Sequence, residues 1–205
     1  DACEQITLHI RYNTSNKIET ANDFGDVQLD FDVQIDSIIF DALRESGQVY
    51  CAASEERPFT TILNPEGKFI CTFDPLDGSS IIDSNLAIGT IMGIWRRDDT
   101  KKECVGLTAR KDMVGAALSC YGSRTNIIMY NTITKTVDEL TLQKKSIESE
   151  ENEWVSTNKN MMIRPEGRYF SPGNAKSMKY NKGYREIIQY WAKNGYTLRY
   201  SGGMA

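Results

Sequence analysis

The sequence predicts an α+β or layered α/β fold, because helix-like and strand-like patterns occur together without strict alternation. Apolar residues recur at helical spacing in residues 29–46 and 184–193. Residues 49–53 and 69–73 are short apolar runs typical of buried strands, and a turn-forming stretch at 64–67 separates them. The remaining expected elements are a helix at 2–12, strands at 86–95, 115–121, 126–130, 137–142 and 196–201, and surface loops at 13–23 and 144–153.

Composition excludes several classes of protein. The chain has 205 residues, 40% of them hydrophobic, which suffices for one sizeable core or two small lobes. A net charge of −4 gives no basic surplus for nucleic acid, and no apolar run is long enough to span a membrane. No leader pattern follows the first residue, so we expect a signal or transit peptide to be absent or already removed.

The five cysteines give no metal-binding pattern. None is spaced as C-x-x-C, and His9 is the single histidine. We therefore expect five reduced and mostly buried thiols, with Cys3 and Cys104 the most exposed, in a cytosol-like compartment.

The segment from Phe73 to Ser80, FDPLDGSS, carries the strongest chemical signal. Asp74 and Asp77 can converge at the end of an apolar strand, with the carbonyl of Leu76 between them, and such hard oxygen ligands suit Mg²⁺. Gly78 permits close approach of the backbone to a ligand, and Ser79 with Ser80 would open a helix whose free N–H groups attract anions. The same sequence is also common in turns and at helix N-caps, so it does not by itself establish a metal and phosphate site.

Two further acidic groups lie upstream of this segment. Glu55 and Glu56 directly follow a predicted strand, where adjacent carboxylates repel unless a cation or solvent relieves them. Asp26, Asp30 and Asp32 stand at the entrance to a predicted helix, where its dipole also favours acids. Individually these groups have structural explanations, whereas their occurrence together within one short span points to a metal site.

The segment DPLDGSS resembles the signature of the lithium-sensitive phosphatase superfamily, which includes inositol monophosphatases, fructose-1,6-bisphosphatases and sedoheptulose-1,7-bisphosphatases. The resemblance runs from about Gly25 to the last residue. It implies a layered α-β-α-β-α sugar-phosphatase fold, with a metal-binding lobe at about 25–143 and the start of a substrate lobe at about 160–205. Three short sequence segments, at 81–83, 170–174 and 196–204, most resemble those of sedoheptulose-1,7-bisphosphatases.

The resemblance also implies roles for individual residues. Glu55, Asp74, Asp77 and the carbonyl of Leu76 would hold two or three Mg²⁺ ions, which Mn²⁺ can replace, with help from Asp26. Asp32 and Glu56 would position and deprotonate the attacking water. Substrate would be bound by Gly78, Ser79 and Ser80 at the 1-phosphate, by Asn174, Arg199 and Tyr200 at the distal phosphate, and by Gly203 and Met204 at the sugar.

The activity implied is hydrolysis of the 1-phosphate of sedoheptulose 1,7-bisphosphate. Fructose-1,6-bisphosphatase or dual specificity is the alternative, and a non-catalytic Mg²⁺-dependent binding protein is a further one. The resemblance also implies a homodimer or homotetramer, because the counterpart of Arg199 reaches a neighbouring subunit. Members of the family continue well beyond Ala205, so we expect the C-terminal metal and phosphate ligands to be missing from this chain.

Redox control is expected to be absent. Plastid relatives carry a pair of loop cysteines where this chain has Ser15 and Thr20, and hydroxyl groups cannot form a disulfide. Cys51 and Cys71 fall in predicted buried strands, where thiols ionise poorly. We therefore expect activity to be insensitive to dithiol reduction and the cytoplasm to be the location, with a plastid as the alternative.

Overall fold

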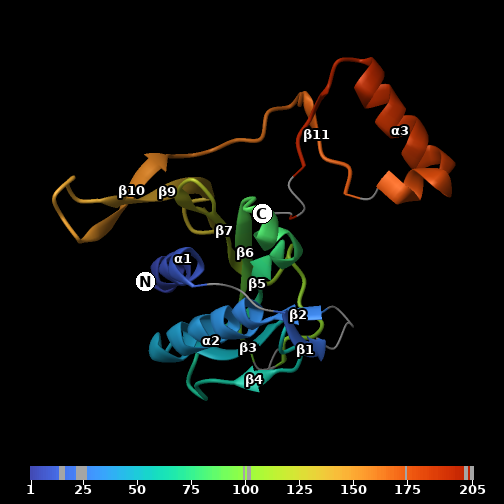
Figure 1. Ribbon diagram of the computed structural model, residues 1–205. Coiled ribbons are helices and arrows are strands. Elements are labelled where there is room, and N and C mark those ends of the chain that lie inside the picture. Colours follow the sequence, from blue (N-terminus) through green and yellow to red (C-terminus); the bar gives the residue numbers. More distant parts are fainter. Residues whose placement is uncertain are drawn as a thin grey trace.

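The computed structural model describes residues 1–13, 17–21, 27–98, 100, 103–173, 175–200 and 203. Its centre is one mixed sheet built from β3 (Val49–Ser54), β4 (Thr61–Ile62), β5 (Phe69–Asp77), β6 (Ile88–Arg96), β7 (Met113–Tyr121), β8 (Thr125–Asn131), β9 (Thr136–Lys144) and β10 (Asn152–Asn158). These eight strands lie in the order β10-β9-β8-β7-β6-β5-β3-β4 (Figure 1). β3 and β5 are parallel, and the other neighbouring pairs are antiparallel.

Two helices pack on the sheet, α1 (Ala2–Tyr12) and α2 (Asp30–Glu45) (Figure 1). α2 places Phe31, Ile35 and Ile39 four residues apart, so all three lie on one face and are almost fully buried. They join Phe40 and Phe73, whose rings meet edge-on with centroids 5.2 Å apart. Each such side chain contributes roughly 1.5–3 kcal/mol when fully buried. The core therefore fixes α2 against β3 and β5.

The turn before β5 depends on close packing. Gly67 lies against β3, and a Cβ on it would come within 2.2 Å of the backbone nitrogen of Tyr50. Arg97 closes the same region, because it donates hydrogen bonds to the carbonyls of Pro65 and Gly67 and stacks on Tyr50. β5 is thereby held in register with β3.

The last part of the chain stands apart from the large sheet (Figure 1). Beyond β10 the chain forms β11 (Tyr169–Phe170), the short 3-10 helix η2 (Ala175–Lys179), α3 (Lys182–Lys193) and β12 (Thr197–Leu198). β11 and β12 pair in parallel, and Phe170 packs on Trp191 of α3 with ring centroids 5.6 Å apart. Asn181 caps α3, since its side chain accepts from the Tyr184 N–H at 3.0 Å.

The predicted fold class and its main elements are confirmed. The expected helices at 2–12, 29–46 and 184–193 and the strands at 49–53, 69–73, 86–95, 115–121, 126–130 and 137–142 form with small shifts at their ends. The division into lobes at 25–143 and 160–205 stays a prediction.

Three local predictions were wrong. Within the expected loop at 13–23, residues 17–21 form β1 (Lys17–Ala21), which pairs with β2 (Val27–Leu29). The expected loop at 144–153 is shorter, because residues 152–158 form β10 on the edge of the sheet. The strand expected at 196–201 is reduced to two residues, since β11 offers only two partners. Edge and two-residue strands have too little apolar pattern to be recognised locally.

Candidate active site

Two parallel strands bring the predicted acids together. β3 and β5 run side by side, with Ser54 opposite Phe73, so both strands end at the same edge of the sheet. The N–H of Glu55 continues this pairing and donates to the carbonyl of Phe73 at 3.1 Å. Glu55 therefore emerges beside Asp74, although separate strands deliver the two residues.

The end of β5 is irregular in a way that turns its acids toward one region. Its register against β6 shifts between Asp74 and Asp77, which marks a β-bulge. The N–H of Leu76 donates to the carboxylate of Asp74 at 3.0 Å, and the Leu76 side chain is buried in the core. The segment thus combines an anchored turn with two carboxylates that are only half-buried.

The acids are close enough to affect one another's ionisation. The pKa of Asp74 is raised from its ordinary 3.8 to about 7, chiefly by burial and also by the negative charges of Glu55 and Asp77, against a lowering hydrogen bond from the Leu76 N–H. Asp74 also shares a hydrogen bond with the Glu55 side chain. One carboxyl therefore tends to keep its proton at neutral pH unless a cation compensates the charge.

A buried pair, Thr90 and Tyr121, supports this turn. The hydroxyl of Thr90 donates to the carbonyl of Pro75 at 2.8 Å and lies 2.9 Å from the hydroxyl of Tyr121. Both side chains are about 5% exposed. Thr90 and Tyr121 therefore brace the acidic turn, which comprises Asp74 to Asp77.

Gly78 follows the acids and adopts φ +86°, a left-handed conformation that favours glycine. The helix expected to start at Ser79 is a 3-10 helix of six residues, η1 (Ser79–Ser84). Its first internal bond runs from the N–H of Ile81 to the carbonyl of Gly78, so the N–H groups of Ser79 and Ser80 precede the ladder. These N–H groups open a shorter helix than expected.

Gly203 lies against this turn. A Cβ placed on Gly203 would be 2.8 Å from a carboxylate oxygen of Asp77, and one on Gly78 would be 3.5 Å from the Cα of Gly203. The structure thus brings one residue predicted for the sugar site to the residues predicted for metal and phosphate.

Arg199 and Tyr200 are exposed and follow β12 directly. The Arg199 guanidinium lies 5.7 Å from the Tyr169 ring and donates to the carbonyl of Leu198 at 2.9 Å. Consecutive Cα atoms are about 3.8 Å apart, so the Cα atom of Arg199 is within roughly 15 Å of that of Gly203. Both side chains are accessible to a ligand. They lie a few residues before Gly203, which contacts the acidic turn.

Asp32 and Glu56 occupy different settings. Asp32 is 4% exposed in the first turn of α2, and Glu56 is half-buried in the loop after β3. Asp36, one helical turn after Asp32, contacts Ser54 and Arg57, so this face of α2 is turned toward the loop that carries Glu56. Three other predicted site residues, Asp26, Asn174 and Met204, lie outside the described residues.

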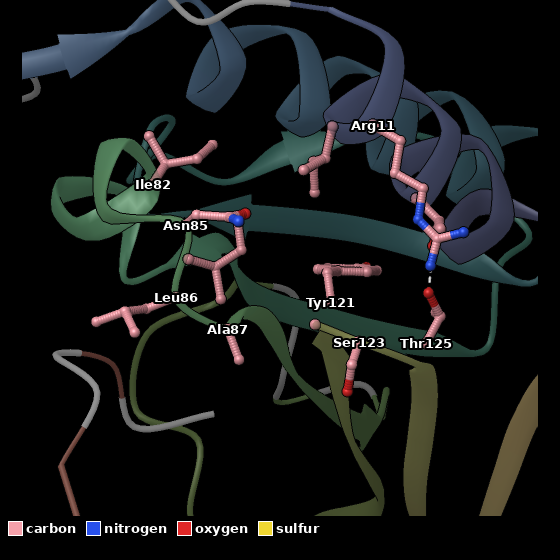
Figure 2. Close-up of a pocket in the computed structure, with 12 residues that line it drawn as sticks. Arg11, Ile82, Asn85, Leu86, Ala87, Tyr121, Ser123 and Thr125 are labelled. Carbon is pink, nitrogen blue, oxygen red and sulfur yellow. Dashed lines mark hydrogen bonds between the residues drawn. The ribbon is translucent and has the colours of Figure 1, made fainter.

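The first of two cavities borders the acidic turn. One of about 520 Å³ reaches Glu55 and Asp74 and is otherwise lined mainly by apolar side chains, including Ile91, Trp95 and Val105. Another of about 560 Å³ lies between α1, the segment after η1 and the β7–β8 turn, where Figure 2 shows Arg11 on one side and Asn85 on the other. None of the predicted acids lines the second cavity.

Within the described part of the chain, no three His, Cys, Asp or Glu side chains are gathered closely enough to enclose a metal ion. Glu55 and Asp74 adjoin, and Asp77 acts on Asp74 through its charge. In the same described part, no helix is both long and apolar enough to cross a membrane.

The fold and the acidic turn define a class of protein. Residues 7–155 match the family described as "Fructose-1-6-bisphosphatase, N-terminal domain", and the chain belongs to this family.

Among curated proteins it is 37% identical over 206 residues to "Sedoheptulose-1,7-bisphosphatase, chloroplastic" of Spinacia oleracea, covering 100% of this chain and 50% of that protein. It is 36% identical over 205 residues to "Fructose-1,6-bisphosphatase class 1" of Pelobacter propionicus, covering 99% and 59%. The chain thus spans about half the length of the curated relatives it matches.

A solved fructose-1,6-bisphosphatase of Leishmania major in its holo form superposes with a TM-score of 0.85 at 30% identity, covering 99% of this chain and 65% of that one.

Proposed function

We propose that this protein is a Mg²⁺-dependent sugar bisphosphatase that removes the 1-phosphate of sedoheptulose 1,7-bisphosphate, giving sedoheptulose 7-phosphate and phosphate. The observation that carries the proposal is the placement of Glu55 beside Asp74 at the ends of two parallel strands, with Asp77 on the same turn. The names of the curated relatives support the substrate class.

The donor groups fit a hard divalent cation. Glu55, Asp74 and Asp77 offer carboxylates, and Leu76 offers a backbone carbonyl in the same turn. The negative charges of Glu55 and Asp77 raise the pKa of Asp74, and a bound cation would favour its ionised form. We assign two or three Mg²⁺ ions to these ligands and Asp26, with Mn²⁺ as a substitute. Bound divalent metal lowers the pKa of water and neutralises charge developing on phosphate.

The remaining site residues would bind and orient the substrate. The N–H groups at Gly78, Ser79 and Ser80 suit the 1-phosphate, because they precede the hydrogen-bond ladder of η1. Arg199 presents a planar guanidinium for the distal phosphate, and Tyr200 and Asn174 are assigned beside it. Gly203 and Met204 would line the sugar. Asp32 and Glu56 would accept the proton of the attacking water.

Fructose 1,6-bisphosphate is the alternative substrate. Relatives named for either sugar are 36–37% identical to this chain, so identity does not favour one branch. The proposal of sedoheptulose 1,7-bisphosphate as the substrate rests on the short sequence segments at 81–83, 170–174 and 196–204. A homodimer or homotetramer remains part of the proposal, because the counterpart of Arg199 in similar enzymes reaches a second subunit. A cytoplasmic location is also part of the proposal.

Phosphate release from each bisphosphate, with Mg²⁺ and with chelator, tests the proposal on the full-length protein. Faster release from the sedoheptulose substrate that stops in chelator supports it. Faster release from fructose 1,6-bisphosphate moves the protein to the other branch. Absence of hydrolysis together with retained Mg²⁺ binding indicates a non-catalytic binding protein.

A further inference from the structure

The loop that carries Glu55 and Glu56 is closed by its own ends. Ser54 and Arg57 flank the two glutamates. The N–H of Ser54 donates to the carbonyl of Arg57 at 3.0 Å, and the N–H of Arg57 donates to the hydroxyl of Ser54 at 2.9 Å. Any movement of Ser54 or Arg57 therefore moves the glutamates between them.

One buried carboxylate on α2 holds both ends of this loop. Asp36 is 1% exposed. It accepts a hydrogen bond from the Ser54 hydroxyl at 2.5 Å through one oxygen, and its other oxygen lies 2.6 Å from Nε of Arg57. Burial raises the pKa of Asp36, while the Ser54 hydrogen bond and the Arg57 charge lower it. Arg57 compensates the charge of this buried carboxylate through the ion pair, and Ser54 provides the hydrogen bond to its other oxygen.

The guanidinium of Arg57 makes two more contacts on the same helix. One terminal nitrogen donates to the hydroxyl of Ser37 at 2.9 Å, and the guanidinium carbon lies 4.7 Å from the centroid of the Phe40 ring. These contacts span one turn of α2 and fix the planar group in orientation as well as position. Phe40 itself belongs to the core, so the loop is tied to the buried core of the protein.

We infer that Arg57, anchored by Asp36 and Ser54, is a positioning residue that sets the conformation of Glu55 and Glu56 for metal and water. This inference rests on the proposed function, because it assigns a purpose to the loop that carries a metal ligand and a proton acceptor. Arg57 acts through the loop and not on the substrate. Supporting residues of this kind are typically responsible for 10–100-fold in metal affinity.

Arg97 provides a matched control. Like Arg57, it stacks on an aromatic ring, with 3.7 Å between its guanidinium and Tyr50, and it donates to the carbonyls of Pro65 and Gly67 in a turn next to β3. It lies at the opposite end of β3 from the acids. Substitution of either arginine removes a stacked, loop-closing side chain, and only the loop at Arg57 carries residues predicted for the site, Glu55 and Glu56.

The test compares Arg57→Ala, Arg57→Lys and Asp36→Asn with Arg97→Ala in the full-length protein. Mn²⁺ binding by calorimetry, hydrogen exchange of peptides covering residues 50–60, and kcat, KM and the Mg²⁺ concentration for half-maximal rate are measured for each. We expect the Arg57 variants to bind Mn²⁺ about 10–100-fold more weakly, with faster exchange in this peptide, lower kcat and an unchanged KM. Arg57→Lys should fail to rescue, because an ammonium cannot reach Asp36 and Ser37 together.

Thermal unfolding separates positioning from general damage. If Arg97→Ala loses as much stability and weakens Mn²⁺ binding equally, Arg57 is merely structural and the inference is overturned. Restoration of normal metal binding by Arg57→Lys would also overturn it, since charge alone would then suffice. If wild-type protein neither binds Mn²⁺ nor hydrolyses a bisphosphate, the proposed function fails and the inference fails with it. If wild type is active and Arg57→Ala is unchanged, only the inference fails.

Discussion

Gly203 packs directly on Asp77, one from the segment after β12 and the other from the end of β5. A methyl group on Gly203 would lie 2.8 Å from a carboxylate oxygen of Asp77, closer than real contacts allow. The contact joins the acidic turn to the part of the chain that stands apart from the sheet (Figure 1). The absence of a side chain at Gly203 is therefore a condition for the position of a predicted metal ligand.

Gly203→Ala should consequently displace Asp77 and reduce kcat/KM about a hundredfold, the size of loss that a 1 Å misplacement in an active site can produce. Steady-state kinetics over a range of Mg²⁺ concentrations measures this. Gly167→Ala is the control, since a Cβ there would meet nothing within 4 Å. Equal kinetics for the two variants would show that Asp77 tolerates the methyl group.

Asp74→Asn should abolish turnover and leave the metal-free fold intact. The pKa of Asp74 in the folded state, about 7, lies above its ordinary 3.8, so the folded protein holds this proton more tightly than the unfolded chain. The stability that this proton contributes is complete below pH about 4 and is lost as pH rises toward 7. Relative to wild type, Asp74→Asn should therefore become more stable as pH rises from 5 to 8.

Urea denaturation in chelator at both pH values measures this difference. Asp83→Asn, which removes an exposed carboxylate in η1, is the control. Wild-type activity that persists in chelator would contradict the assignment of Asp74 as a metal ligand.

Arg199→Ala should raise KM for bisphosphates about tenfold to a hundredfold, the value of a charge-assisted hydrogen bond, with little effect on a small monophosphate. Arg168→Ala is the matched control, because its guanidinium lies 5.6 Å from the Tyr196 ring much as that of Arg199 lies 5.7 Å from Tyr169. Initial rates with both substrates give the comparison. Equal impairment on the two substrates would make Arg199 structural.

Thr90→Val should destabilise the protein by about 1–3 kcal/mol, because it leaves the buried carbonyl of Pro75 without its donor. Chemical denaturation measures the change in the free energy of unfolding. Thr134→Val, on an exposed turn, should change stability far less. A Thr90→Val protein as stable as wild type would mean that the brace under the acidic turn is dispensable.

The cysteines should differ in reactivity. Cys51 and Cys71 are buried as the sequence predicted, but Cys104 is half-buried with its sulfur 3.9 Å from that of Cys51, a contact the sequence did not reveal. A hydrogen bond with Cys51 lowers the pKa of Cys104, whereas burial raises that of Cys71 to about 12. Iodoacetamide at pH 8 should therefore modify Cys104 first.

Cys51→Ala should slow that reaction by removing the hydrogen bond, and Cys120→Ala should leave it unchanged. Mass spectrometry over time measures both. Modification of Cys71 ahead of Cys104 would contradict the assignment. Insensitivity of activity to dithiol reduction stays a prediction.

Much of the site could be predicted because its signals are short-ranged. The apolar run of β5, the stiff Asp74-Pro75 step and the left-handed Gly78 all depend on neighbouring residues, so the turn was recognisable without knowledge of strand order. The role of Arg57 was not recognisable, because its partners Asp36 and Ser37 lie on another element. The same holds for Thr90 and Tyr121, which meet only after β6 and β7 pair.

By itself, the sequence determined the two amphipathic helices, the central strands and the chemistry of the DPLDGSS turn, since periodicity and turn chemistry act over a few residues. Only the tertiary structure decided which residues surround that turn. The parallel pairing of β3 with β5 places Glu55 beside Asp74, and the path after β12 places Gly203 against Asp77. Such contacts arise from the burial of whole faces of helices and sheet, which fixes the order of the strands, and no local pattern specifies that order.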